Sequence, residues 1–126
     1  KNIPSPTLLA LVGYLLITSL KYFIDRPRPH QVYPETSRII EKTDPSFPSA
    51  HAFLASICFC FTPKKFRQFK FIYPLAFYLL VLIPFGLIYT GVHYFSDVVV
   101  GAIIGLLMPK IFSEKFSTKL IKKLFF

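Results

Sequence analysis

Long apolar runs separated by polar segments are the main pattern along this chain. Four runs come close to the roughly 20 apolar residues that a helix needs to cross a bilayer: residues 7–24, 48–62, 71–90 and 98–112. Pro74 and Pro84 lie in the third run, where neighbouring helices can tolerate them as kinks. Gly101 and Gly105 lie in the fourth, at a spacing that lets helix backbones approach closely without naming the partner. The pattern predicts an all-α, integral-membrane helical bundle with about four transmembrane helices.

The composition favours the same class. Hydrophobic residues make up 53% of the 126 residues and charged residues only 17%, which is too apolar for an ordinary soluble fold. We expect one membrane-embedded domain over residues 1–126, with the lipid bilayer as its surroundings. Because the first residue is Lys1, we expect that the numbered chain begins inside a longer gene product.

The net charge of +9 is distributed unevenly. The connection at 62–70 has four basic residues and no acidic one, and the tail from Pro109 has five lysines against Glu114. If the helices alternate in direction, both segments lie on one side, which the positive-inside rule identifies as the cytoplasm. The charge therefore needs no nucleic-acid partner. Three other segments then meet at the external face, namely 21–29, 48–51 and 93–97, with the polar loop 30–47 above them.

Ionisable residues near that face are candidates for chemistry because charges are costly near lipid. Lys21 and Arg28 are placed to form an anion clamp, since a guanidinium can bind two oxygens of one phosphate. The alternative for each is that it only extends toward the interface. Ser49, Ala50 and His51 begin the second run, where free backbone N–H groups attract anions. There the alternatives are a helix-capping Ser49 and a buried, hydrogen-bonded His51.

His93 and Asp97 are four residues apart, so a helical turn would bring them to one face. A carboxylate bonded to one imidazole nitrogen fixes the tautomer and leaves the other nitrogen free to attack. The alternative is that Asp97 only caps the fourth helix.

Together these residues resemble the three-part signature of the type 2 phosphatidic-acid phosphatase superfamily. Its parts here are Lys21 with Arg28-Pro29, then Pro48-Ser49-Ala50-His51, and then His93 through Asp97. The resemblance implies a helical core that usually has six membrane helices, of which the first run here matches the third, so the two preceding helices are either missing from this chain or dispensable. It also implies that no metal and no cofactor are needed.

The roles implied by the resemblance concern phosphoryl transfer. His93 would attack phosphorus and form a phosphohistidine, Asp97 would orient it, and His51 would protonate the leaving alkoxide and then activate water. The non-bridging oxygens would be held by Lys21, Arg28, Ser49 and the backbone at Ala50.

Two positions depart from the family pattern. Ala50 stands where glycine is usual, and Gly86 and Leu87 stand where the third motif usually begins with Ser-Arg. Losing one cation from a transition state costs about 10²–10³ in rate. We expect a compensating cation from the external loop, Arg38 first, with Arg26 and Lys42 behind it. If residues 87–93 continue the helix, Leu87 lies about 9 Å deeper than His93.

The function predicted is hydrolysis of a lipid phosphomonoester or diphosphate, such as phosphatidylglycerol phosphate, undecaprenyl diphosphate, phosphatidate or lipid A 1-phosphate. The expected location is a bacterial inner membrane with the site on the periplasmic face. Vanadate-dependent halide oxidation uses the same pocket in the family but on a soluble scaffold. A phosphate-lipid binding or assembly protein with a degraded site is the non-enzymatic alternative, motivated by Leu87.

Overall fold

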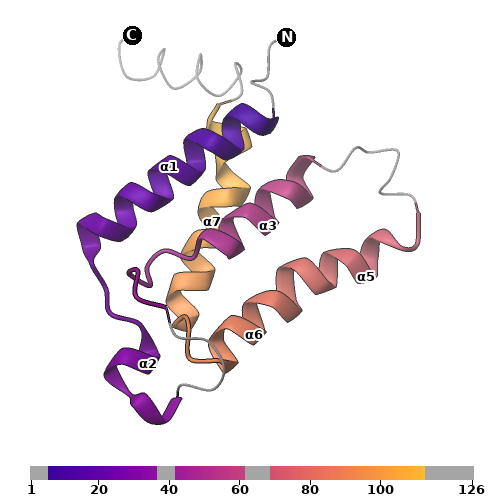
Figure 1. Cartoon of the computed structure of the whole chain (residues 1–126). Helices are drawn as coiled ribbons and strands as arrows, with labels where there is room; N and C mark the ends of the chain where they lie inside the picture. Colours follow the sequence, from indigo (N-terminus) through magenta and orange to yellow (C-terminus); the bar gives the residue numbers. More distant parts are fainter. Residues whose placement is uncertain (1–5, 37–41, 62–68, 113–126) are drawn as a thin grey trace, which may run out of the picture.

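The computed structural model describes residues 6–36, 42–61 and 69–112, and these ranges contain helices and loops but no strand (Figure 1). The elements are α1 (Pro6–Ile24), α2 (Pro29–Val32), η1 (Pro34–Thr36), α3 (Ala50–Phe61), α5 (Ile72–Phe77), η2 (Tyr78–Leu82), α6 (Ile83–Tyr89) and α7 (Phe95–Ile111). The predicted all-α fold is confirmed. The expected loop 30–47 differs in detail, since α2 and η1 occupy its first part.

The third apolar run forms one continuous rod of α5, η2 and α6 (Figure 1). Its middle section, η2, is a π-helix that lies between Pro74 and Pro84. Pro84 has no N–H to donate to the preceding turn, and a widened π turn is one of the ways in which a helix absorbs such a defect. The run therefore remains helical through both prolines.

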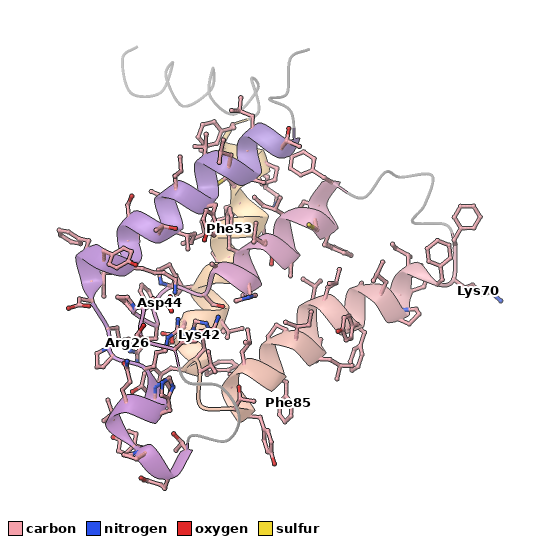
Figure 2. The ribbon with its side chains drawn as sticks, viewed as in Figure 1. Arg26, Lys42, Asp44, Phe53, Lys70 and Phe85 are labelled. Atoms are coloured by element: carbon pink, nitrogen blue, oxygen red, sulfur yellow. The ribbon has the colours of Figure 1, made fainter. Side chains whose placement is uncertain are left out.

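The core lies where α3 packs between α1 and α7, with Phe53 near the centre (Figure 2). Its buried cluster consists of Leu9, Ile17, Phe53, Ile57 and Met108. The two glycines of α7 face α3, because a Cβ at Gly101 would collide with the carbonyl oxygen of Ser49 and one at Gly105 with that of Phe53. The partner of the glycine pair is therefore α3.

Much of the outer surface is apolar. The exposed fraction is 88% at Phe23, 71% at Tyr73 and 71% at Phe95, and further large hydrophobics are exposed on α1 and on the α5–α6 rod. Two helical stretches, Thr7–Val32 and Ile72–Tyr89, are long and apolar enough to cross a membrane, while α3 and α7 are shorter, at 12 and 17 residues. These surfaces and helices support a membrane location.

Candidate active site

Three segments that are far apart in the sequence meet at one end of the bundle. Hydrogen bonds join their backbones: Ser46 N–H donates to Arg26 O at 2.8 Å, Ser49 N–H to Asp97 O at 2.9 Å, and His30 N–H to Gly91 O at 3.1 Å. Arg26, Lys42 and Asp44 gather there in Figure 2, between α2 and the starts of α3 and α7. The structure confirms that the three segments meet, as the alternating directions of the helices predicted.

A cavity of about 440 Å³ opens at this end of the bundle. Its polar and charged lining residues are Thr18, Lys21, Arg28, Lys42, Asp44, His51 and His93. Its other walls come from Tyr14 and Tyr22 on α1 and from Ala50 and Leu54 on α3. Charged groups and an aromatic, apolar wall therefore line one space.

His93 lies in the turn before α7 and is 2% exposed. Asp97, in the first turn of α7, is fully buried, and its Oδ2 accepts a hydrogen bond from Tyr94 N–H at 2.8 Å. The same Oδ2 lies 3.5 Å from His93 Nδ1, an ion-pair separation longer than a good hydrogen bond, and Nδ1 has no hydrogen-bond partner among the described residues. Asp97 therefore caps α7 and also faces His93. The helix-capping role of Asp97 and its role beside His93 are therefore compatible.

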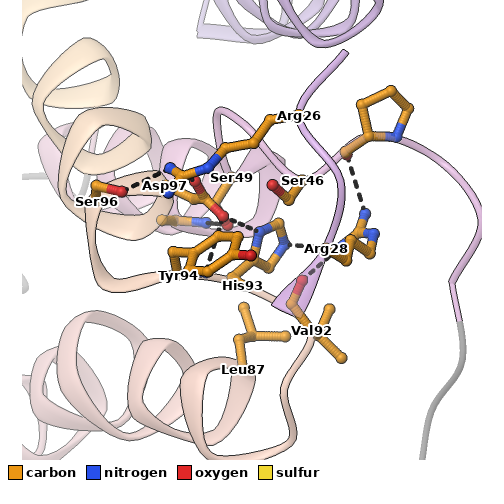
Figure 3. A network of polar contacts seen from close by, with 12 residues as sticks. Arg26, Arg28, Ser46, Ser49, Leu87, Val92, His93, Tyr94, Ser96 and Asp97 are labelled. Atoms are coloured by element: carbon orange, nitrogen blue, oxygen red, sulfur yellow. Dashed lines mark hydrogen bonds and ion pairs between the residues drawn. The ribbon is translucent and has the colours of Figure 1, made fainter. Parts of the chain in front are cut away.

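The other nitrogen of His93 faces Arg28 (Figure 3). Arg28 Nη1 lies 3.4 Å from His93 Nε2 and donates to Val92 O at 2.8 Å. A guanidinium can only donate, so this contact is attractive only if Nε2 carries the lone pair. The proton of a neutral His93 then sits on Nδ1, toward Asp97.

The electrostatics of His93 favour its neutral form. Burial lowers the pKa of His93 below its usual value, the neighbouring carboxylate of Asp97 opposes this shift, and the charge of Arg28 adds to it. A neutral imidazole whose Nε2 carries no proton is the form that can act as a nucleophile or base.

Lys21 and Arg28 are both buried, and both bind the carboxylate of Asp44. Asp44 Oδ2 accepts from Lys21 Nζ at 3.0 Å and from Arg28 Nη2 at 2.9 Å. Sequence reasoning missed Asp44 because it is one acidic residue of a polar loop, and nothing in its spacing marks it.

The residues at the start of α3 differ in whether they line the cavity. Ala50 and His51 line the cavity, and His51 is exposed there. Ser49 is fully buried and does not line it; its Oγ accepts a long hydrogen bond of 3.4 Å from Ala52 N–H. In this structure Ser49 therefore makes the helix-capping contact that the sequence offered as an alternative.

The three candidates for a compensating cation have different surroundings. Arg38 lies outside the described residues. Arg26 binds Asp97 Oδ1 at 2.8 Å and is not among the residues that line the cavity, so its contact in this structure is with Asp97. Lys42 does line the cavity. Its positive charge there disfavours the charged forms of Lys21 and His51.

Residues 87–93 do not continue the third helix, so the condition under which Leu87 would lie a helical distance below His93 is not met. α6 ends at Tyr89, and the chain reverses through Gly91, whose φ of 70° suits glycine. As a result His93 N–H and Val92 N–H both donate to Leu87 O at 3.1 Å. Position 87 is therefore beside His93 (Figure 3).

Comparison with known proteins gives one match. The family model described as the PAP2 superfamily matches residues 6–120, which is most of the chain. Searches of curated proteins and of solved structures gave no match. Family members are phosphatases that act on phosphate esters, and the cation-lined cavity beside two histidines agrees with this activity. The chain belongs to the PAP2 superfamily and is, at that level, a phosphoric ester hydrolase.

Proposed function

We propose that this protein removes phosphate from a membrane lipid through a phosphohistidine intermediate on His93. The observation that carries the proposal is the position of His93, with Nε2 toward the cation-lined cavity and Nδ1 toward the buried Asp97. The substrate is a phosphomonoester or diphosphate, with phosphatidylglycerol phosphate, undecaprenyl diphosphate, phosphatidate and lipid A 1-phosphate as the candidates.

In the first step, the Nε2 lone pair of His93 attacks phosphorus and the bond from phosphorus to the lipid oxygen breaks. His51 gives its proton to the departing oxygen, so the lipid leaves as an alcohol, or as a monophosphate if the substrate was a diphosphate. Asp97 stabilises the charge that develops on the imidazole. Lys21 and Arg28 bind the non-bridging oxygens, where fixed positive charge lowers the barrier most.

In the second step, His51 takes a proton from water as the water oxygen attacks phosphorus. The phosphorus–nitrogen bond breaks, and inorganic phosphate and free His93 result. Backbone N–H groups at the start of α3, including that of Ala50, add donors of the kind found at helix N-termini. Lys42 is the third cation, replacing the arginine that position 87 lacks.

A lipid substrate is supported by the cavity wall and by the outer surface. Tyr14 and Tyr22 on α1 and Leu54 on α3 line the cavity, and much of the outer surface of α1 is apolar. We propose a bacterial inner membrane as the location, with the cavity on its external face.

The proposal is tested by rapid quenching with a substrate that carries labelled phosphate. Wild-type protein should retain acid-labile, base-stable phosphate, and His93→Ala should retain none. A phosphoenzyme that persists in His93→Ala would exclude this nucleophile. Phosphate release from a panel of detergent-solubilised lipids, with and without vanadate, identifies the substrate.

A second candidate function rests on Leu87. Without the usual arginine, the same pocket could hold a phosphate lipid without cleaving it. This alternative predicts saturable binding of the lipid panel with no phosphate release and no phosphoenzyme in wild-type protein.

A further inference from the structure

All five N–H groups of the Arg28 guanidinium face an acceptor inside the protein. Nε donates to Asp44 O at 2.7 Å, while Nη1 faces Val92 O at 2.8 Å and His93 Nε2 at 3.4 Å. Nη2 donates to Asp44 Oδ2 at 2.9 Å and to Pro45 O at 3.3 Å. A guanidinium has five N–H donors. Arg28 therefore has no donor left for a phosphate unless one of these contacts breaks.

Lys21 is occupied by the same partners. Its ammonium donates to Pro45 O at 2.8 Å and to Asp44 Oδ2 at 3.0 Å. One carboxylate oxygen thus joins an ammonium and a guanidinium, as a non-bridging oxygen of a bound phosphate would.

Among these acceptors, only the Asp44 carboxylate is both charged and free to leave. The carbonyls of Asp44, Pro45 and Val92 are backbone groups and are fixed by the fold. The Asp44 side chain is 42% exposed and lines the cavity. Burial tends to raise the pKa of Asp44, but the hydrogen bond from Lys21 and the charge of Arg28 outweigh it and lower the pKa. The group is therefore an anion at neutral pH.

We propose that the carboxylate of Asp44 is a resident anion of the phosphate subsite, which the phosphate group of the substrate displaces and which returns when inorganic phosphate leaves. This inference rests on the proposed function. Its consequence is weaker binding of free phosphate, because the apparent affinity falls in proportion to the time for which Asp44 occupies the cations. Asp44 would thereby limit inhibition by the product.

A purely structural Asp44 predicts the opposite sign. If the carboxylate only held Lys21 and Arg28 in place, a neutral residue there would leave both cations misplaced, and phosphate would bind more weakly. If it competes with phosphate, the same substitution makes phosphate bind more tightly.

The experiment is calorimetric titration of inorganic phosphate into the full chain in detergent, which needs no turnover. Asp44→Asn keeps the size of the side chain and removes its charge, and Asp44→Ser gives a second neutral variant if the first does not fold. Glu35→Gln is the matched control, because it removes one exposed negative charge from η1. We expect both Asp44 variants to bind phosphate at least about tenfold more tightly, as for an anion that occupies the site nine-tenths of the time. Glu35→Gln should stay within about twofold of wild type, because solvent and salt screen an exposed charge.

Unchanged or weaker binding in both Asp44 variants would overturn the inference, and so would an equal gain in Glu35→Gln. If no form of the protein binds phosphate, the inference fails, while trapping of the phosphohistidine still tests the proposed function by itself. If the Asp44 variants bind more tightly while no phosphohistidine can be trapped, the resident anion stands and the catalytic proposal alone fails.

Discussion

Arg26 contacts three residues around the carboxylate that faces His93. Its Nη1 donates to Asp97 Oδ1 and to Ser96 Oγ, each at 2.8 Å, and its guanidinium lies 4.0 Å from the centre of the Tyr94 ring (Figure 3). Asp97 is thus held from one side by Arg26 and from the other by the backbone of Tyr94. We infer that Arg26 acts on catalysis through Asp97, as a positioning residue.

This role predicts opposite pH shifts for two variants. His93 must be neutral to attack, so the acid limb of kcat/KM reports its pKa. Asp97→Asn removes the group that opposes the lowering of the His93 pKa, so the acid limb should move to lower pH. Arg26→Ala leaves the Asp97 charge uncompensated, so the limb should move to higher pH while kcat falls by about tenfold, the order of one charged hydrogen bond.

Arg26→Lys is the matched control, because an ammonium can still pair with Asp97 Oδ1. It should restore most of kcat and return the acid limb toward the wild-type position. If Arg26→Ala instead raises KM and leaves kcat and the pH profile unchanged, Arg26 binds substrate and does not position Asp97.

Lys42 is the described loop cation that lines the cavity, and it is held there through its backbone. Its carbonyl oxygen faces His30 Nε2 at 3.1 Å and accepts from Gln31 Nε2 at 3.3 Å, while His30 Nδ1 faces Gly91 O at 3.1 Å. These two contacts place His30 between the loop of Lys42 and the turn that leads to His93. A neutral imidazole can donate to only one of the two carbonyl oxygens.

If Lys42 replaces the missing arginine, Lys42→Ala should lower kcat/KM on the best lipid by at least tenfold, or about 1.4 kcal/mol. Lys42→Arg should keep most of the activity, and Lys70→Ala, at the far end of the bundle (Figure 2), should be neutral. Leu87→Arg should add little while Lys42 is present.

Arg38→Ala tests the other candidate in the same assay. If Arg38→Ala and Lys42→Ala both stay near wild type while Leu87→Arg raises activity strongly, the compensation hypothesis fails.

Residue pairs that are close in sequence could be predicted, and pairs that long loops join could not. His93 and Asp97 are four positions apart and do face each other, although the segment between them is not the helical turn that the spacing suggested, because α7 begins at Phe95 and Tyr94 before it is extended. Arg26 and Asp97 are 71 positions apart, and Asp44 meets Arg28 only because the loop folds back over α1. Such contacts depend on the path of the loop, which no periodic pattern encodes.

At the level of elements, Gly101 sets how closely α7 approaches the start of α3. Its missing Cβ leaves room for the carbonyl oxygen of Ser49, whose N–H in turn donates to Asp97 O at 2.9 Å. The first turns of α3 and α7 carry His51 and Asp97. The distance between these two helices therefore determines the geometry of the site.

Gly101→Ala and Gly86→Ala should change stability in opposite directions. Alanine is favoured over glycine inside a helix by about 1 kcal/mol, so propensity alone predicts that both variants gain stability. A Cβ at Gly86 would meet nothing within 4 Å, whereas one at Gly101 would meet backbone atoms that cannot rotate away. We expect Gly86→Ala to melt at the wild-type temperature or above, and Gly101→Ala to melt several degrees lower with at least tenfold less activity. Equal melting temperatures for the two variants would show that α3 and α7 can separate without cost.

The apolar runs located the rods of the fold, but not how they end. The glycine spacing indicated close packing, and the structure identifies the partner as α3. The end of the third run at residue 90 agrees with the end of α6 at Tyr89, but the direction of the turn at Gly91 was not predicted, because an apolar run does not encode how the chain reverses after it. That turn is what brings Leu87 O to His93 N–H.

On the scale of the whole molecule, the candidate site and Lys70 lie at opposite ends of the bundle (Figure 2). Lys70 precedes α5 and is the last residue of the basic connection 62–70, most of which is outside the described residues. The site end carries the Asp44 and Asp97 carboxylates among its cations, whereas the connection has no acidic residue. This difference is the basis for placing the cavity outside the cytoplasm.

That orientation can be tested with single cysteines in a chain in which Cys58 and Cys60 are replaced by alanine. Glu35→Cys lies in the exposed η1 segment at the site end, and Lys70→Cys is exposed at the other end. Because basic connections stay on the cytoplasmic side, a membrane-impermeant thiol reagent should label Glu35→Cys in intact cells and Lys70→Cys only after the cells are opened. Labelling both variants in opened cells confirms that each thiol is accessible. The reverse pattern in intact cells would put the cavity in the cytoplasm, and the lipid headgroup that reaches Lys21, Arg28 and His93 would then have to come from the inner leaflet.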